Sequence, residues 1–431
     1  MNALDPLRSA LAVLVLGGAL GGCGVNPVTG SSEMSFVSEQ QEIRTGEQQY
    51  GPSQQSEGGQ YVLDPELNAY VARVGQSLAR VSERSQLPYE FVVLNNSSPN
   101  AWALPGGKIA VNRGLLVQLE DESQLAAVLG HEIVHAAARH GAKAQETGTL
   151  LNIGLAVLGV ATANSAYQDL ALQGAQISGA LVQTRYGREA ELESDYYGMQ
   201  YMARAGYDPQ GAVRLQETFV KLSQGRRQDW LSGLFASHPP SQERVDANRR
   251  TAQKLGPGDD GREEYQRRIA RLKRDQPAYD AYDRGVAAMN AGRYQEALKY
   301  AEQALKLQER EGLFHELRGV AAARLDRPAD AINSFNRAIA ANPNFFRPHL
   351  LRGKLHLERG NLDIAAQDLS ASNRLLPTAD ATFGLGEIAQ RQGDTQTALR
   401  HYQAVANSGS SLAPAARERI ARLGSGLTNI R

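Results

Sequence analysis

The sequence predicts an α+β domain followed by an all-α solenoid of helical repeats. In the C-terminal part, Gly285, Gly319 and Gly353 lie 34 residues apart, a spacing typical of a repeated helix pair. The N-terminal part instead mixes helical patterns with a strand-like segment at 108–112. A chain of 431 residues is also longer than one ordinary hydrophobic core requires. We therefore expect two folded units.

The composition is that of a globular protein, with 42% hydrophobic and 21% charged residues. Lys and Arg number 46, and Asp and Glu also number 46, so the formal net charge is zero. Nucleic-acid-binding domains usually carry a basic excess. We therefore predict no nucleic-acid partner.

Residues 1–22 are predicted to be a lipoprotein-type signal peptide. The apolar segment 11–20 is too short to span a membrane, and it ends in Leu-Gly-Gly-Cys at 20–23. This run resembles a bacterial lipobox, and Cys23 is the only cysteine, which predicts lipidation at Cys23. Because Gly24 is not an aspartate, the resemblance implies the periplasmic side of the outer membrane. The alternative is plain cleavage to a soluble periplasmic form.

The repeats match the tetratricopeptide pattern. The middle copy has small and aromatic residues at the expected offsets: Gly319, Ala331, Phe335, Ala338 and Pro343. A fourth copy begins around Gly386, and 415–423 is predicted to cap the stack. We assign 277–425 to this domain and 254–276, which begins with Gly-, Pro- and Asp-rich turn residues, to a linker. Such solenoids bind proteins, although a structural spacer or a dimerisation element is the alternative.

The motif His131-Glu132-Ile133-Val134-His135 predicts a zinc site. Residues four apart on a helix share a face, so His131 and His135 can bind one metal ion. Glu132 then lies next to a metal-bound water and is the predicted general base. A catalytic zinc normally takes three protein ligands, so a third must come from elsewhere in the chain.

An acidic helical segment at 188–195 offers candidates for that third ligand. Glu191 and Asp195 are four residues apart and share a face. A solvent-exposed acidic helix face is the alternative, and it is our interpretation of Glu189 and Glu193. Spacing alone does not decide between the two interpretations.

The sequence resembles the gluzincin zinc metallopeptidases, the family of the HtpX and CAAX prenyl proteases. The resemblance rests on residues 26–30, 100–107, 131–135, 191–198, 205–209 and 237–240, together with Arg244. It implies a zincin fold for residues 23–253 and one zinc ion per chain. It also implies that Glu191 is the third ligand and that Asp195 orients a ligand histidine and assists proton transfer.

His238 and Arg244 lie in the last of these stretches. We hypothesise that His238 occupies the fourth position on the metal, displaces the water and silences the enzyme until its loop moves. The alternatives are a structural histidine or a substrate contact shared with Arg244. His140, five residues after His135, is predicted to lie off the ligand face and to be structural.

Two further segments carry expectations about substrate and membrane. The resemblance implies that the strand 108–112 borders the cleft, where it could bind an extended substrate by strand addition. An ordinary strand of the sheet is the alternative. The apolar segment 150–163 is too short to span a membrane, and a buried helix, a lid or a membrane-surface contact are its alternative roles.

Together these observations predict a periplasmic zinc endopeptidase that degrades misfolded or stalled outer-membrane proteins. Its repeats would hold the substrate or the outer-membrane assembly machinery, and its lipid would hold it at the membrane surface. The alternative is a chaperone or scaffold whose protease site is latent.

Overall fold

The computed structural model describes residues 23–144, 186–223, 234–235 and 237–428. The predicted signal peptide and the segment 150–163 lie outside these residues. Within the described residues no helix is both long and apolar enough to cross a membrane. At the N-terminal end of the described chain, Cys23 begins strand β1 (Cys23–Val25), which pairs antiparallel with β2 (Ser32–Met34).

A three-stranded sheet forms the floor of the first domain. Its order is β3 (Glu90–Leu94), β5 (Lys108–Asn112) and β4 (Ala101–Leu104), with β5 parallel to β3 and antiparallel to β4. The prediction that 108–112 binds a substrate by strand addition is wrong, because β5 is hydrogen-bonded on both sides. Among the described residues β4 pairs only with β5, so β4 is an edge strand.

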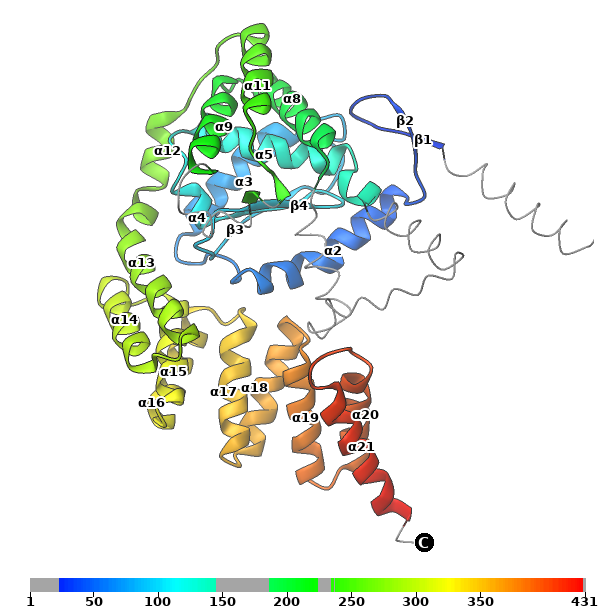
Figure 1. Cartoon of the computed structure of the whole chain (residues 1–431), viewed down its shortest axis with the longest axis vertical. Coiled ribbons are helices and arrows are strands. Elements are labelled where there is room, and N and C mark those ends of the chain that lie inside the picture. The colour runs from blue at the N-terminus through cyan, green and yellow to red at the C-terminus, as the bar shows by residue number, and fades with distance from the viewer. Residues whose placement is uncertain (1–22, 145–185, 224–233, 236, 429–431) are drawn as a thin grey trace, which may run out of the picture.

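Alternate residues of each strand point to opposite faces of the sheet, and both faces are buried by packing. One face packs on α2 (Glu39–Ser56), where the Tyr50 ring meets the Trp102 ring edge-on at 6.2 Å between centroids. The other face, including Ala103 and Val111, joins the main core beneath α5 (Glu122–Ala137). Figure 1 shows the sheet between α2 and this helical layer.

The helical layer above the sheet surrounds α5. Its longer members besides α5 are α3 (Pro65–Ala79), α8 (Arg188–Arg204), α9 (Gln210–Ser223) and α11 (Gln242–Leu255), and the short α4 (Arg113–Leu116) follows β5 directly. Every residue of α5 from 123 to 137 is buried, since α3, α8 and α9 all pack on it. The motif helix is therefore the centre of the domain.

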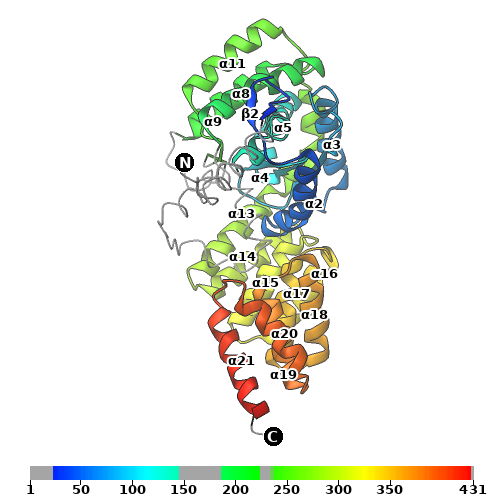
Figure 2. The ribbon, with the colours of Figure 1, turned by 90° about the vertical axis from the view of Figure 1, so that its right-hand side faces the viewer.

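The chain then passes through α12 (Arg262–Arg268) into a stack of helix pairs, which confirms the predicted solenoid (Figures 1 and 2). The pairs are α13 (Ala270–Asn290) with α14 (Tyr294–Leu307), α15 (Gly312–Arg324) with α16 (Pro328–Ala341), α17 (Phe346–Glu358) with α18 (Leu362–Leu375), and α19 (Ala379–Arg391) with α20 (Thr395–Ala406), followed by α21 (Ala413–Thr428). The repeated glycines permit close packing: a Cβ on Gly319 would lie 2.6 Å from the Phe335 ring.

The first repeats share one core with the metal-motif domain. Tyr279 of α13, Phe314 of α15 and Phe345 belong to the same apolar cluster as Ile133 of α5. At the junction the guanidinium of Arg113 lies 3.3 Å above the Tyr279 ring, and its Nε donates to Asn95 Oδ1 at 2.8 Å. The two units are thus joined by buried contacts.

A second contact lies further along the solenoid. The Nε2 of Gln55, on α2, donates to the Asn344 carbonyl at 2.8 Å, and its Oε1 accepts from the Phe346 amide at 2.9 Å. The Phe345 ring packs on Gly59, where an added Cβ would lie 3.0 Å from it. The loop before α17 is therefore fixed on the end of α2.

Candidate metal centre

Helix α5 begins at Asp121, whose carboxylate accepts a hydrogen bond from the Gln124 amide at 2.9 Å. His131 and His135 lie four residues apart on this helix and share the face that contacts α8. Their Nε2 atoms lie 3.0 Å apart. The predicted helical pairing of the two histidines is present.

A glycine crossing brings α8 onto that face. A Cβ on Gly130 would lie 3.1 Å from the Gly198 carbonyl oxygen, and a Cβ on Gly198 would lie 3.0 Å from the His131 amide nitrogen. Only two glycines permit the backbones to come this close. The crossing places Asp195 and Glu191, about one and two turns before Gly198 respectively, beside the imidazoles.

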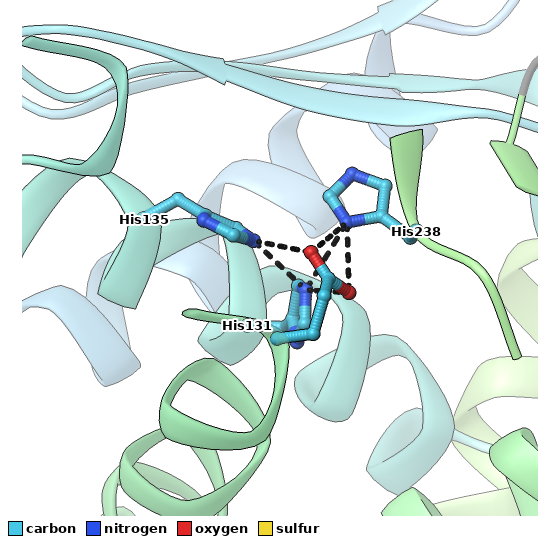
Figure 3. Close-up of side chains that lie close together, drawn as sticks. His131, His135 and His238 are labelled. Atoms are coloured by element: carbon cyan, nitrogen blue, oxygen red, sulfur yellow. Dashed lines mark hydrogen bonds and ion pairs between the residues drawn. The ribbon is translucent and has the colours of Figure 1, made fainter. Parts of the chain in front are cut away.

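Four buried side chains converge at this point: His131, His135, Glu191 and His238. Glu191 Oε2 lies 3.4 Å from His131 Nε2, and Glu191 Oε1 lies 3.4 Å from His135 Nε2. His238 Nδ1 lies 3.1 Å from Glu191 Oε1 and 3.3 Å from His131 Nε2. Figure 3 shows the three imidazoles turned toward one another.

These separations fit a tetrahedral metal ion. Ligand atoms about 2.0–2.1 Å from a central ion lie about 3.3–3.4 Å apart at the corners of a tetrahedron. The measured separations of 3.0 to 3.4 Å match that edge. Two or three imidazoles with one carboxylate are also a donor set that suits zinc.

Asp195 contacts the outer side of His131. Its Oδ1 lies 2.9 Å from His131 Nδ1, the nitrogen that faces away from the cluster. Arg244 holds the same carboxylate through Nε and Nη2, each at 2.7 Å, and its Nη1 lies 2.8 Å from Glu191 Oε2. Arg244, which the sequence indicated as a substrate contact, is thus buried between the two carboxylates.

The charges of the metal-free cluster shift its pKa values strongly. Burial lowers the pKa of His131, but the charge of Glu191 and the hydrogen bond to Asp195 outweigh it and raise that pKa to about 10. Burial holds the pKa of His135 well below its ordinary value. Burial raises the pKa of Glu191, but the nearby His238 and His131 charges outweigh it and keep that pKa far below its ordinary value.

Glu132 is a buried carboxylate with spare hydrogen-bonding capacity. Its Oε1 lies 3.5 Å from His238 Nε2, and its Oε2 has no hydrogen-bond partner among the described residues. Burial raises its pKa, which makes the carboxylate a stronger base than an exposed one. An orphaned buried oxygen beside a ligand cluster suits a group that takes a proton from a reactant.

A small cleft with a volume of about 40 Å³ lies beside Glu132 and His131. Its walls are largely apolar and include Met199, Met202, Leu215, Phe219 and Leu234. Ala101 of the edge strand β4 lies on the same cleft. The edge strand and the acid–base group therefore border one space.

Three residues near the cluster were missed or misassigned from the sequence. The Tyr186 ring stacks on His135 with centroids 3.9 Å apart. His140 is not among the four converging side chains, but its Nδ1 lies 2.8 Å from His135 Nδ1, a contact that the sequence did not indicate. Glu193 is only partly exposed and contacts His140, so it is not part of a solvated face.

The HExxH helix, the acidic helix and the cleft define a metallopeptidase-type site. In agreement, residues 65–252 match peptidase family M48, and residues 282–344 and 350–421 match the tetratricopeptide repeat. The chain therefore carries a peptidase family M48 domain followed by tetratricopeptide repeats.

Several known proteins are similar to part of this chain. The mitochondrial metalloendopeptidase OMA1 of Arabidopsis thaliana is 29% identical over 241 residues, which cover 56% of this chain and 47% of that protein. The beta-barrel assembly-enhancing protease of Escherichia coli K12 is 29% identical over 246 residues, covering 54% and 48%. The chain thus spans about half the length of these relatives. Among solved structures, a crystal structure of MamA is 19% identical, covers 38% of this chain and 91% of that one, and has a TM-score of 0.29.

Proposed function

We propose that this chain is a zinc-dependent endopeptidase with one zinc ion, held by His131, His135 and Glu191. The observation that carries the proposal is the set of tetrahedral-edge separations among these ligands beside Glu132, whose Oε2 has no hydrogen-bond partner in the part of the chain that the structure describes. When bound there, zinc would lower the pKa of a water molecule and polarise a peptide carbonyl.

The protein residues then divide the remaining work. Glu132 takes the proton of the attacking water and passes it to the leaving amine, a role that its raised pKa favours. Asp195 accepts a hydrogen bond from the Nδ1–H of His131 and so directs the His131 Nε2 lone pair to the cluster. Arg244 neutralises Asp195 and one oxygen of Glu191.

We further propose that β4, instead of β5, binds the substrate backbone. The edge strand at 101–104 borders the cleft, and Ala101 lines the same space as Glu132. An extended peptide that adds to this edge is held through backbone hydrogen bonds, which tolerate many sequences. Binding of this kind suits unfolded protein substrates.

The cellular part of the proposal is a role in envelope protein quality control. Misfolded or stalled outer-membrane proteins would be the substrates, and the repeats would contact them or the assembly machinery. The chain would lie in the periplasm, anchored through a lipid on Cys23 to the inner leaflet of the outer membrane. Similarity to a protein named beta-barrel assembly-enhancing protease and the lipobox-like residues 20–23 support this proposal.

His238 supports a second candidate function. Its Nδ1 lies among the ligand atoms, where a fourth protein ligand would displace the reactive water. A site closed in this way would make the chain chiefly a chaperone or scaffold for outer-membrane protein assembly, with a latent protease.

One experiment separates these functions. We would measure zinc content and cleavage of unfolded outer-membrane protein for the form lacking residues 1–23 and for its Glu132→Gln variant. One zinc in both, with cleavage only in the unsubstituted protein, supports the endopeptidase. Zinc in both without cleavage, together with cleavage by His238→Ala, supports the latent enzyme. Absence of tightly bound zinc would overturn both.

A further inference from the structure

The second histidine of the motif has its own outer partner, separate from the Asp195 contact of His131. His135 Nε2 faces the cluster, and its Nδ1 lies 2.8 Å from His140 Nδ1. On its other side, His140 Nε2 lies 3.3 Å from Glu193 Oε1. A continuous chain of contacts therefore runs from a proposed metal ligand to a carboxylate on α8.

Only one arrangement of protons satisfies this chain when the Nε2 of His135 binds a metal. The His135 Nδ1 then carries a proton and donates it to the unprotonated Nδ1 of His140. His140 must carry its proton on Nε2, which donates to Glu193. The carboxylate therefore fixes the tautomer of each imidazole.

The backbone is bent so as to bring His140 back to the site. Helix α5 ends at Ala137, and Arg139 adopts a left-handed conformation with φ of 63°. That conformation is unfavourable for a residue with a side chain and is often found at functional sites. The Arg139 guanidinium is held by the buried Glu42, which also pairs with Arg84 at 2.9 Å. The turn is thus maintained by buried ion pairs.

Glu193 is held in turn by the N-terminal segment. Asn26 is buried, and its Oδ1 accepts from the Val28 amide at 2.9 Å and the Thr29 amide at 3.2 Å. Its Nδ2 is thereby directed to Glu193 Oε1, at 3.4 Å. The turn at 26–30 therefore rests on the far end of the chain of contacts that begins at His135.

We propose that His140, Glu193 and Asn26 are positioning residues of the metal centre, which fix the orientation and tautomer of His135. This inference rests on the proposed metal-binding function. His140 and Glu193 would then orient His135 as Asp195 orients His131, and the turn at 26–30 would contribute to metal affinity. Outer partners of this kind typically contribute about 10–100-fold to metal affinity or activity.

The test is the zinc dissociation constant, measured by competition with a chromophoric chelator on metal-stripped protein. We expect His140→Leu to bind zinc about 10–100-fold more weakly. His140→Asn should recover much of the loss, because Asn Oδ1 takes the place of Nδ1 and accepts from His135. His315→Leu is the matched control, since His315 is a buried histidine of α15 and should leave zinc affinity unchanged.

A second pair of variants decides the matter if His140→Leu does not fold. Glu193→Gln and Glu189→Gln remove the same charge from the same helix, but only Glu193 contacts His140. We expect weaker zinc binding for Glu193→Gln than for Glu189→Gln. Equal affinities in that pair, or unchanged affinity in a folded His140→Leu, would overturn the inference. Failure of the unsubstituted protein to bind zinc would instead overturn the proposed function.

Discussion

Gly130 of α5 and Gly198 of α8 meet backbone to backbone: a Cβ on Gly198 would lie 3.1 Å from the Gly130 carbonyl carbon. The site depends on this crossing because two ligands lie on one helix and the third lies on the other. Neither backbone can move aside without shifting the side chains that form the cluster. The tolerance of the site for a single methyl group is therefore a direct test of its geometry.

We predict that Gly198→Ala lowers stability by about 1–3 kcal/mol, since the new methyl overpacks two backbones. Helix propensity alone predicts the opposite sign, because Ala is favoured over Gly inside a helix by roughly 1 kcal/mol. Urea unfolding of the metal-free protein measures the difference. Gly187→Ala is the control, because no described residue other than the two chain neighbours comes within 4 Å of the added Cβ. A stabilised Gly198→Ala variant would contradict the crossing.

Loss of Arg244 should be costly in the metal-free protein. Arg244→Ala leaves Asp195 and Glu191 buried without their cation, and breaking such a pair typically costs about 3–5 kcal/mol. Arg249→Ala, which removes an exposed arginine from the same helix, should change stability by less than about 1 kcal/mol. Thermal unfolding with and without added zinc checks both variants. Equal effects of the two would show that Arg244 is dispensable for the cluster.

Zinc binding should release one proton near neutral pH. In the metal-free protein the raised His131 pKa of about 10 keeps that imidazole protonated at pH 7, whereas the lowered pKa of His135 keeps it neutral. Zinc must displace the His131 proton, so affinity should rise about tenfold per pH unit from pH 7 toward pH 10. Calorimetry in two buffers with different ionisation enthalpies counts the protons. Release of none, or of two, would contradict these shifts.

The first repeats and the metal-motif domain should unfold together in one transition. Arg113→Ala removes a buried cation–π contact with Tyr279 and a hydrogen bond to Asn95, which together contribute roughly 3 kcal/mol. The control is Arg284→Ala, because Arg284 is exposed and lies 5.4 Å from the Tyr300 ring. Differential scanning calorimetry should show a lower melting temperature only for Arg113→Ala. A repeat domain that melts separately and unchanged would contradict the shared core.

The site residues that could be predicted from the sequence are those that lie together on one helix. The pairing of His131 and His135 follows from helical spacing, and Glu132 follows with it. Glu191 needed a family resemblance, because the contact between α5 and α8 depends on two glycines 68 residues apart. His238 was expected near the metal on the same resemblance, and it lies in the cluster.

Two features of the site could not be predicted from the local periodicity of the sequence. The contact of His140 with His135 was not predicted, because it depends on α5 ending at Ala137 and on Arg139 turning the chain back. The strand at 108–112 was recognised, but its central place in the sheet depends on its pairing with β3 and β4, which lie elsewhere in the sequence. Contacts that are distant in sequence decided both cases.

The apolar cluster shared by Ile133, Tyr279 and Phe345 also limits how this protein can be recombined. A chimera that joins a foreign repeat array near residue 253 or 276 would expose the underside of the metal-motif domain. A junction after α17 keeps every one of these buried contacts and exchanges only the distal repeats. The proximal repeats must therefore be kept together with the metal-motif domain. New binding specificity is best introduced in the helices from α18 onward.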